Sequence, residues 1–272
     1  MNDLIKINNT RNTITDKCIV LDLDETLVYS NTDFSILNNL KIFKDKSLND
    51  IKSRSYILRL EDAITPKGYG EISNLWGIKR PHIKNFLNFC FRYFKVVAIW
   101  SAGKKEYVDQ LVKNIFIEII GYPHIIFSWN EIKHIKDGSF TKTLQKMIDS
   151  VPGLEKYMNL ENTLIIDDLL QNFTENKDNG ILIPSYSPSM NIKSLREDDI
   201  SLQQFISWLL KEDVKNSKDV RLLKKDEIFK IDKAKLEEIK DSDVQESFIK
   251  IVPFEKNFKN RILRPNNNNI KV

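Results

Sequence analysis

Short apolar segments recur along the chain, and most of them show little alternation with polar residues. The best candidates for strands are CIVLDL (18–23), KVVAIWS (95–101), HIIFSW (124–129), TLIIDD (163–168) and GILIP (180–184). Strands of a parallel sheet are covered on both faces and therefore consist of continuous apolar runs, whereas a strand with one exposed face alternates. The pattern predicts a parallel sheet.

Between these segments the apolar residues follow a helical spacing. In KKEYVDQLVKNIF (104–116) they form one stripe at i, i+3, i+4, i+7 and i+8, made of Val108, Leu111, Val112, Ile115 and Phe116. We expect two more helices, at 81–94 with Pro81 in the first turn and at 198–212 with acidic residues at its start. Strands that alternate with helices predict an α/β fold, a Rossmann-like parallel sheet flanked by helices.

Two segments fall outside this alternation. Residues 31–79 contain a polar, lysine-rich piece, the strand candidate SRSYILRL and the turn-forming residues PKGYG, and we interpret them as an insertion that carries a small hairpin. Residues 213–272 are densely charged and predict a partly helical extension with a disordered, Asn-rich end, RPNNNNIKV. The expected organisation is one domain over residues 1–212, followed by this C-terminal extension.

Composition narrows the class of protein. The 272 residues are 41% hydrophobic and 29% charged, which is ordinary for a soluble globular protein, and no apolar stretch is long enough to span a membrane. The net charge is only +4, so we expect no membrane association and contact with nucleic acid only indirectly. The N-terminus lacks the features of a secretory signal. Cys18 and Cys90 lie in apolar surroundings, as free thiols do. We expect an intracellular protein, with nucleus and cytoplasm both open.

Carboxylates stand where the predicted strands end. Asp22 and Asp24 close the first strand in an i, i+2 relation, and Asp167 and Asp168 close a later one. Because ligands of a parallel α/β sheet bind outside the carboxyl ends of its strands, we expect these side chains to converge on one crevice. Carboxylates that lie so close repel one another unless a cation neutralises them. Mg²⁺ is the hard, oxygen-preferring cation that suits the set.

Two further side chains complete a set for phosphoryl transfer. Ser101 ends a strand and would offer a hydroxyl beside backbone N–H groups, and Lys142 precedes a helical pattern and would supply positive charge. In such a set Asp22 attacks phosphorus and forms an aspartyl-phosphate, while Asp24 protonates the leaving oxygen and then activates water. Ser101, Lys142 and Mg²⁺ would hold the transferring oxygens.

The order of these motifs resembles the haloacid dehalogenase (HAD) superfamily, in the form found in phosphatases of the RNA polymerase II carboxy-terminal domain (CTD), the small CTD phosphatase or NLI-interacting factor-like family. DLDETLV matches the signature D-x-D-E-T-L-V, and KRPHIKNFL resembles the RPG helix. VVAIWSAGKKEYV is similar to the second motif, FTKTL to the lysine motif and LIIDDLLQNF to the (D/N)DSP motif. The resemblance covers residues 17–210.

The resemblance implies a role for each acidic position that matches. Asp22 corresponds to the nucleophile, and Asp24 corresponds to the acid/base, with its backbone carbonyl on Mg²⁺. Asp22 and Asp168 correspond to carboxylate ligands of the metal, and Asp167 corresponds to a residue that supports those ligands.

The resemblance also implies that two positions bind phosphate. Ser101 stands in place of the usual threonine and keeps the hydroxyl, and Lys142 corresponds to the lysine that binds the phosphate charge. Two departures concern substrate contacts more than the chemistry. The segment IDDLLQN lacks the Ser-Pro that follows the acidic pair, and KRPH lacks the glycine of RPG.

The function implied is that of a Mg²⁺-dependent protein serine/threonine phosphatase that forms an aspartyl-phosphate, a phosphoric monoester hydrolase. Its expected partner is a phosphoprotein substrate, and the resemblance points to the CTD of RNA polymerase. One alternative is a catalytically weak or inactive HAD-like binding scaffold. Another is a phosphatase of the same superfamily that acts on small molecules or nucleic-acid ends.

Overall fold

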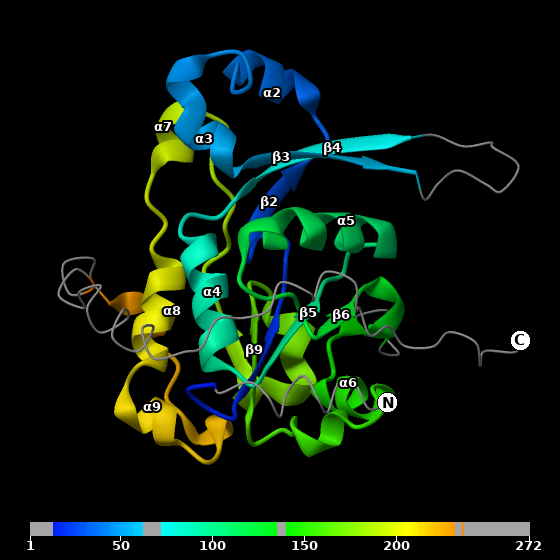
Figure 1. Cartoon of the computed structure of the whole chain (residues 1–272), viewed down its shortest axis with the longest axis vertical. Coiled ribbons are helices and arrows are strands. Elements are labelled where there is room, and N and C mark those ends of the chain that lie inside the picture. Colours follow the sequence, from blue (N-terminus) through cyan, green and yellow to red (C-terminus); the bar gives the residue numbers. More distant parts are fainter. Residues whose placement is uncertain (1–12, 62–71, 135–139, 232–235, 237–272) are drawn as a thin grey trace, which may run out of the picture.

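A five-stranded parallel sheet forms the centre of the protein, in the order β10-β9-β1-β5-β6 (Figure 1). The computed structural model describes residues 13–61, 72–134, 140–231 and 236. The strands of the sheet are β1 (Cys18–Leu21), β5 (Val96–Trp100), β6 (Ile125–Phe127), β9 (Thr163–Asp167) and β10 (Gly180–Leu182). Each of the five strand candidates is a strand of this sheet, and the predicted Rossmann-like α/β fold is confirmed.

Helices cover both faces of the central sheet, which explains why its strands are apolar at successive positions. Ile19 and Leu21 of β1 belong to the hydrophobic core on one face, and Cys18 and Val20 belong to the core on the other face. All four side chains are fully buried. Burying an aliphatic side chain contributes roughly 1.5–3 kcal/mol, so an alternating polar residue would be costly here. The main covering helices are α4 (Ile83–Tyr93), α5 (Lys105–Ile115), α6 (Leu144–Ser150) and α8 (Ser201–Leu209).

The three helices expected from the apolar spacing are present, each shorter than its pattern. The helix expected at 81–94 begins only at Ile83, because His82 has a left-handed φ of 63° and ends the preceding turn. The segment at 198–212, expected to form one helix, contributes to two helices. Helix α8 ends at Leu209, and a short helix, α9 (Glu212–Asn216), begins three residues later.

The segment after β1 builds a second, three-stranded antiparallel sheet in the order β2-β4-β3, which lies across α5 (Figure 1). The expected hairpin is the pair β3–β4, and the predicted PKGYG turn between them lies outside the described residues. Strand β2 and three helical segments accompany the hairpin. The elements are β2 (Val28–Asn31), α2 (Phe34–Leu40), η1 (Lys46–Leu48), α3 (Asn49–Arg54), β3 (Ser55–Leu60), β4 (Ser73–Lys79) and, from later in the chain, α7 (Ile192–Arg196).

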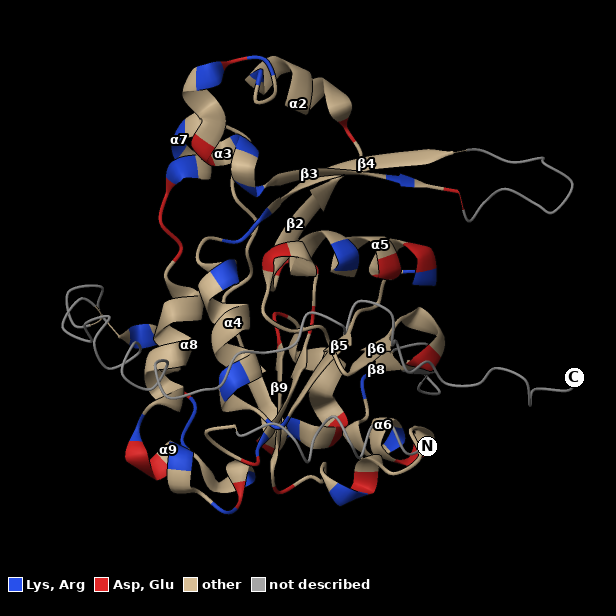
Figure 2. Ribbon diagram, in the orientation of Figure 1, with Lys and Arg blue, Asp and Glu red and all other residues tan. Residues whose placement is uncertain are grey.

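The first part of the C-terminal extension packs on the domain. Val214, Val220 and Ile228 are buried in the same core as α4 and α8. The ammonium group of Lys17 donates to the backbone carbonyls of Lys215 and Ser217, at 2.9 and 2.8 Å. Helix α9 carries residues of both charge signs on its surface (Figure 2). The Asn-rich end lies outside the described residues.

Short elements complete the chain, and one of them leads directly to the candidate site. Strands β7 and β8 pair in an antiparallel arrangement, and Lys142 follows β8. Within the described residues no helix is both long and apolar enough to cross a membrane. The short elements are η2 (Phe116–Glu118), η3 (Trp129–Glu131), β7 (Lys133–His134), β8 (Phe140–Thr141), η4 (Leu154–Lys156), η5 (Leu170–Asn179), η6 (Val220–Leu222) and η7 (Ile228–Lys230).

Candidate active site

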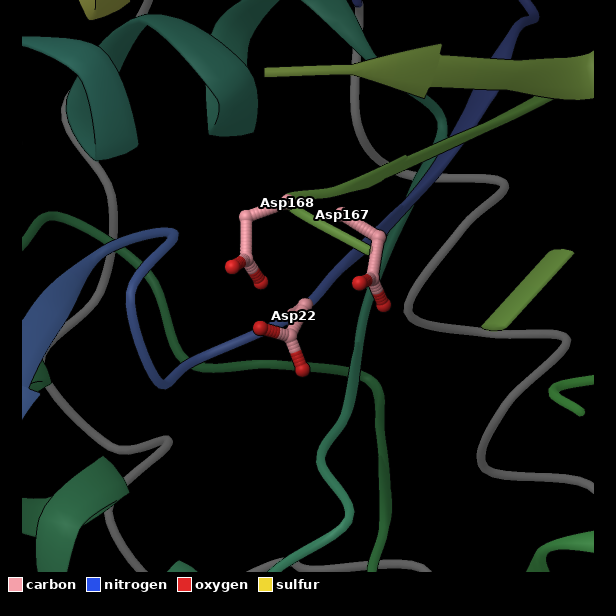
Figure 3. A group of neighbouring side chains, drawn as sticks. All are labelled: Asp22, Asp167 and Asp168. Carbon is pink, nitrogen blue, oxygen red and sulfur yellow. The ribbon is translucent and has the colours of Figure 1, made fainter. Parts of the chain in front are cut away.

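Three carboxylates meet at the carboxyl ends of β1 and β9. Asp22, Asp167 and Asp168 each place one carboxylate oxygen within 4.8 Å of the others (Figure 3). They meet because β1 and β9 are adjacent parallel strands, and the N–H of Asp22 still donates to Ile166 in that ladder, at 3.1 Å. The structure thus brings together three of the four carboxylates that the sequence placed at strand ends, whereas the carboxylate of Asp24 is not part of this group.

Lys142 lies inside this acidic cluster. Its Nζ is 2.6 Å from Oδ1 of Asp22 and 2.6 Å from Oδ2 of Asp167, and its side chain is fully buried. Burial alone would lower the pKa of Lys142, but the charges of the two aspartates outweigh it, so the pKa lies above its usual value. The lysine is therefore a fixed positive charge beside Asp22.

Asp167 is held on both of its oxygens. Oδ2 accepts from Lys142, and Oδ1 accepts from the side-chain amide of Asn172 at 2.8 Å and from the N–H of Leu169 at 2.9 Å. The N–H of Lys142 in turn donates to the carbonyl of Asn172, at 2.6 Å. Asn172 was not among the residues singled out from sequence. Its side chain fixes Asp167, and its main chain fixes Lys142.

The carboxylate of Asp24 has a different environment. It accepts hydrogen bonds from Tyr107, from Ser101 at 3.3 Å and from Ser30 at 3.4 Å, and it is not part of the three-carboxylate group. Burial raises the pKa of Asp24, and the three hydroxyl donors lower it less than burial raises it. The raised pKa follows from burial more than from neighbouring carboxylates. A raised pKa favours the protonated form that a general acid needs.

Ser101 reaches the site through its hydroxyl. Oγ donates to Asp24 and accepts from the N–H of Gly103 at 3.0 Å, and the side chain is fully buried. The N–H of Ser101 itself donates to Phe127, at 3.1 Å, within the sheet. The backbone N–H groups of Ser101 and Gly103 are therefore already bonded within the protein, so the hydroxyl of Ser101 is the group that faces Asp24.

The charge balance of the cluster fits a divalent cation. Three carboxylates surround one ammonium group, which leaves an excess of two negative charges if all are ionised. Asp168 has no ion pair among the described residues, and burial followed by the charge of Asp167 raises its pKa to about 6. A hard cation with oxygen ligands relieves such repulsion, and Mg²⁺ is the common choice for phosphoryl chemistry. Asp22 and Asp168 are the carboxylates with oxygens available for it, because Asp167 is already bonded on both.

An open cleft of about 450 Å³ leads away from Asp24. It runs between α5 and the β2-β4-β3 sheet. Its lining residues are Asp24, Ser30, Asn31, Thr32, Leu75 and Tyr107. Tyr107 and Ser30 were missed from sequence, although the tyrosine of KKEYV stands inside a motif that was recognised. A serine in a short strand carries no signal of its own.

Comparison with known proteins agrees with the fold and the motifs. The family model of NLI interacting factor-like phosphatases matches residues 17–221. A CTD phosphatase-like protein, 355R, of Invertebrate iridescent virus 3 is 33% identical over 99 residues, which are 36% of this chain and 43% of that protein. A protein of Dictyostelium discoideum described as a C-terminal domain small phosphatase is 25% identical over 207 residues, 76% of this chain and 53% of the relative. The chain thus spans about half the length of these two relatives.

Solved structures share the fold at low sequence identity. A variant of the fission yeast RNA polymerase II CTD phosphatase Fcp1, bound to beryllium fluoride, is 16% identical with a TM-score of 0.50, over 94% of this chain and 62% of that one. A second structure of Fcp1 has a TM-score of 0.51 at the same identity, over 88% and 66% of the two chains. Because the family model covers most of the sequence, the chain belongs to the NLI interacting factor-like phosphatase family.

Proposed function

We propose that the protein is a Mg²⁺-dependent protein serine/threonine phosphatase that forms an aspartyl-phosphate on Asp22. The observation that carries this proposal is the buried ammonium of Lys142, bonded to Asp22 and Asp167 within the three-carboxylate cluster. Two buried carboxylates with a half-buried third beside them and one ammonium group are a costly arrangement for stability alone, because burying charge without full compensation is unfavourable. Membership of the phosphatase family supports the same activity.

The first step is attack on phosphorus by Oδ2 of Asp22. Lys142 donates to Oδ1, and within the described residues Oδ2 accepts no hydrogen bond, so this oxygen is available as the nucleophile. The bond between phosphorus and the serine or threonine oxygen breaks as the aspartyl-phosphate forms. Asp24, whose raised pKa favours the protonated form, would give its proton to the leaving oxygen.

The second step returns the enzyme to its starting state. Asp24, now a carboxylate, takes a proton from a water molecule as the water oxygen attacks phosphorus. The bond from phosphorus to Asp22 breaks, and inorganic phosphate leaves. Asp22, Asp168 and the backbone carbonyl of Asp24 would hold Mg²⁺, which would supply positive charge for the phosphoryl oxygens. The Lys142 ammonium and the Ser101 hydroxyl would bind those oxygens from the protein side.

The open cleft beside Asp24 supports a polypeptide substrate. Its volume of about 450 Å³ and its position between α5 and the second sheet leave room for an extended peptide next to the acid/base. The relatives named as CTD phosphatases suggest the CTD of RNA polymerase as the substrate. A phosphoprotein in the nucleus or cytoplasm is the partner that we propose.

The test is release of phosphate from phosphoserine and phosphothreonine peptides in the presence of Mg²⁺. We expect turnover by the wild type and none by Asp22→Asn, which keeps the shape of the side chain but lacks the nucleophilic oxygen. p-Nitrophenyl phosphate and a 3′-phosphorylated DNA oligonucleotide serve as comparison substrates. Equal rates for Asp22→Asn and the wild type would reject the proposal, and preference for DNA ends over every peptide would replace the substrate class.

A further inference from the structure

We propose that an apolar rim beside the active site recognises a large apolar residue adjacent to the phosphorylated serine or threonine. The rim consists of Trp129, Phe140, Leu169 and Leu170. This inference rests on the proposed function and adds a substrate preference to it. Its starting point is the departure of this chain from Ser-Pro after the acidic pair, where two leucines stand instead.

Backbone hydrogen bonds join the rim to residues of the site. The N–H of Leu169 donates to Oδ1 of Asp167, at 2.9 Å, so the turn that carries both leucines is anchored on the acidic cluster. The N–H of Trp129 donates to the carbonyl of Gly103, at 2.9 Å, and Gly103 is in turn bonded to the hydroxyl of Ser101. Main-chain geometry therefore sets Trp129 and Leu169 next to the reaction centre.

These anchored side chains are exposed. The exposed fractions are 36% for Trp129, 39% for Leu169 and 51% for Leu170. A single exposed leucine on a protein surface needs no explanation, but several exposed apolar side chains whose backbone is anchored on one polar site are suited to bind a ligand of that site. Burial of these apolar side chains is favourable only when an apolar group covers them. A substrate bound at the site is a ligand that could do so.

The two halves of the rim are connected through β8. The ring of Trp129 packs edge-on against Phe140, with ring centroids 5.1 Å apart. Phe140 begins β8, which leads to Lys142, and the N–H of Lys142 donates to the carbonyl of Asn172 in η5. Because Leu169 precedes η5 and Leu170 begins it, the strand that carries Phe140 lies beside the segment with the leucines.

The rim and the cleft lie on opposite faces of the central sheet. Leu75 and Tyr107 of the cleft belong to the core on the face of α4 and α5, whereas Phe140 packs on the core of the α6 face. A peptide that crosses the site with its phosphoryl group at Asp22 would therefore place one flank in the cleft and the other on the rim. The rim is thus a second recognition element, distinct from the cleft.

The chemistry of the rim selects the kind of residue that fits. All four of its side chains are apolar. A charged residue of the substrate would lose hydration there without gaining a partner, whereas a leucine or phenylalanine would bury the rim without that penalty. A large, neutral, apolar side chain is the occupant that the surface fits.

The experiment compares phosphoserine peptides that differ only at the residue before or after the phosphoserine, with Leu, Ala or Asp in that place. The kcat/KM for each peptide is measured with the wild type, with the double variant Leu169→Ser, Leu170→Ser, and with Leu222→Ser. Leu222 is a matched control because it is an exposed leucine, 83% accessible, that lies far from the site. It belongs to η6, where the N–H of Val220 donates to the carbonyl of Glu161, at the end of β9 opposite to the acidic cluster. Leu170→Ser alone is included in case the double variant disturbs the turn.

We expect the wild type and Leu222→Ser to prefer Leu over Ala by roughly fivefold to tenfold on one side of the phosphoserine, with Asp slowest. The ratio should fall below about twofold in the double variant and fall in the same direction in Leu170→Ser. The inference would be overturned if the wild type showed no preference among the peptides, or if the double variant kept the preference. In either case, turnover of p-nitrophenyl phosphate would still uphold the proposed function. A wild type that turns over no phosphate ester with Mg²⁺ would defeat both proposals.

Discussion

The ammonium group of Lys142 donates to a carboxylate oxygen of Asp22 at 2.6 Å, and the lysine side chain has no exposure to solvent. The same nitrogen is 2.6 Å from Asp167, so one positive charge serves two acidic residues from neighbouring strands. This contact joins three segments that are far apart in the chain, and it makes the stability of the protein depend on the charge of its site.

Replacing Lys142 by methionine should destabilise the metal-free protein by about 3–5 kcal/mol and abolish turnover. The buried carboxylates would lose their compensating charge, and removal of one partner of a buried ion pair is costly. Added Mg²⁺ should recover part of the lost stability, because a cation among the carboxylates replaces the missing charge. Urea unfolding with and without Mg²⁺ measures this. The control Lys84→Met removes an exposed surface pair and should change little. Equal stability of Lys142→Met and the wild type would contradict the argument.

The affinity for Mg²⁺ should rise as the pH is raised through about 6. Burial first, and then the charge of Asp167, raise the pKa of Asp168 from 3.8 to about 6. The pKa of Asp168 is higher in the folded state than in the unfolded state, so proton binding to Asp168 stabilises the metal-free protein at low pH. This stabilisation is lost as the pH rises from about 4 to beyond 6. Mg²⁺ needs the deprotonated carboxylate, so its binding strengthens over the same interval.

The measurement is the increase of the unfolding midpoint on adding Mg²⁺, at pH 4.5 and at pH 7.5. We expect a small increase at the lower pH, a larger one at the higher pH, and none at either pH for Asp168→Asn. The exposed Asp178→Asn serves as the matched control. An increase that is the same at both pH values would speak against Asp168 as a ligand.

Asp24→Asn should affect substrates according to their leaving groups. On a phosphoserine peptide, kcat should fall by about 10²–10⁴, because the serine oxygen needs a proton to leave. On p-nitrophenyl phosphate the loss should be much smaller, because nitrophenolate leaves without one. Asp22→Asn should lose both activities. If the two substrates lost equal factors in Asp24→Asn, the residue would not be the general acid.

Tyr107→Phe should move the alkaline limb of the pH–rate profile to higher pH. Burial raises the pKa of Asp24, and the hydrogen bond from Tyr107 is the largest opposing influence, so its removal raises the pKa further. The acid form then persists to higher pH, and turnover of phosphoserine peptides declines later. Tyr93→Phe is the control, because its hydroxyl donates to Leu209 away from the site. A limb that stays in place, or moves to lower pH, would contradict this role.

Arg80→Met should cost about 3–5 kcal/mol of stability and lower activity as well. The fully buried guanidinium bonds both oxygens of Asp199, at 2.9 and 2.8 Å, and the carbonyls of Thr26 and Pro184, at 2.9 and 2.8 Å. Thr26 lies two residues beyond Asp24, so the arginine holds the loop that carries Asp24. Urea unfolding and peptide turnover report the two effects. Arg59→Met, at an exposed pair with Glu61, should be close to neutral.

The candidate active-site residues could be proposed from the sequence because their positions follow from strand ends. Asp22, Asp167 and Asp168 meet as expected, since parallel strands deliver their last residues to one edge. Lys142 was placed by motif order alone, and the structure brings it to the same cluster. Tyr107, Ser30 and Asn172 could not be identified in this way, because hydroxyl and amide contacts depend on distances between elements.

The amino-acid sequence by itself determined the parallel sheet, its flanking helices and the gathering of carboxylates at one edge. Continuous apolar runs and stripes of helical spacing are local patterns, and each is satisfied only by burial on the corresponding faces. Tertiary structure alone decided that β2 joins the hairpin, that Val214, Val220 and Ile228 bring the extension onto the core, and that Leu169 and Leu170 stay exposed. These outcomes depend on contacts between distant segments. Three isolated apolar residues, or two adjacent leucines, show no regular spacing along the sequence from which their packing partners could be inferred.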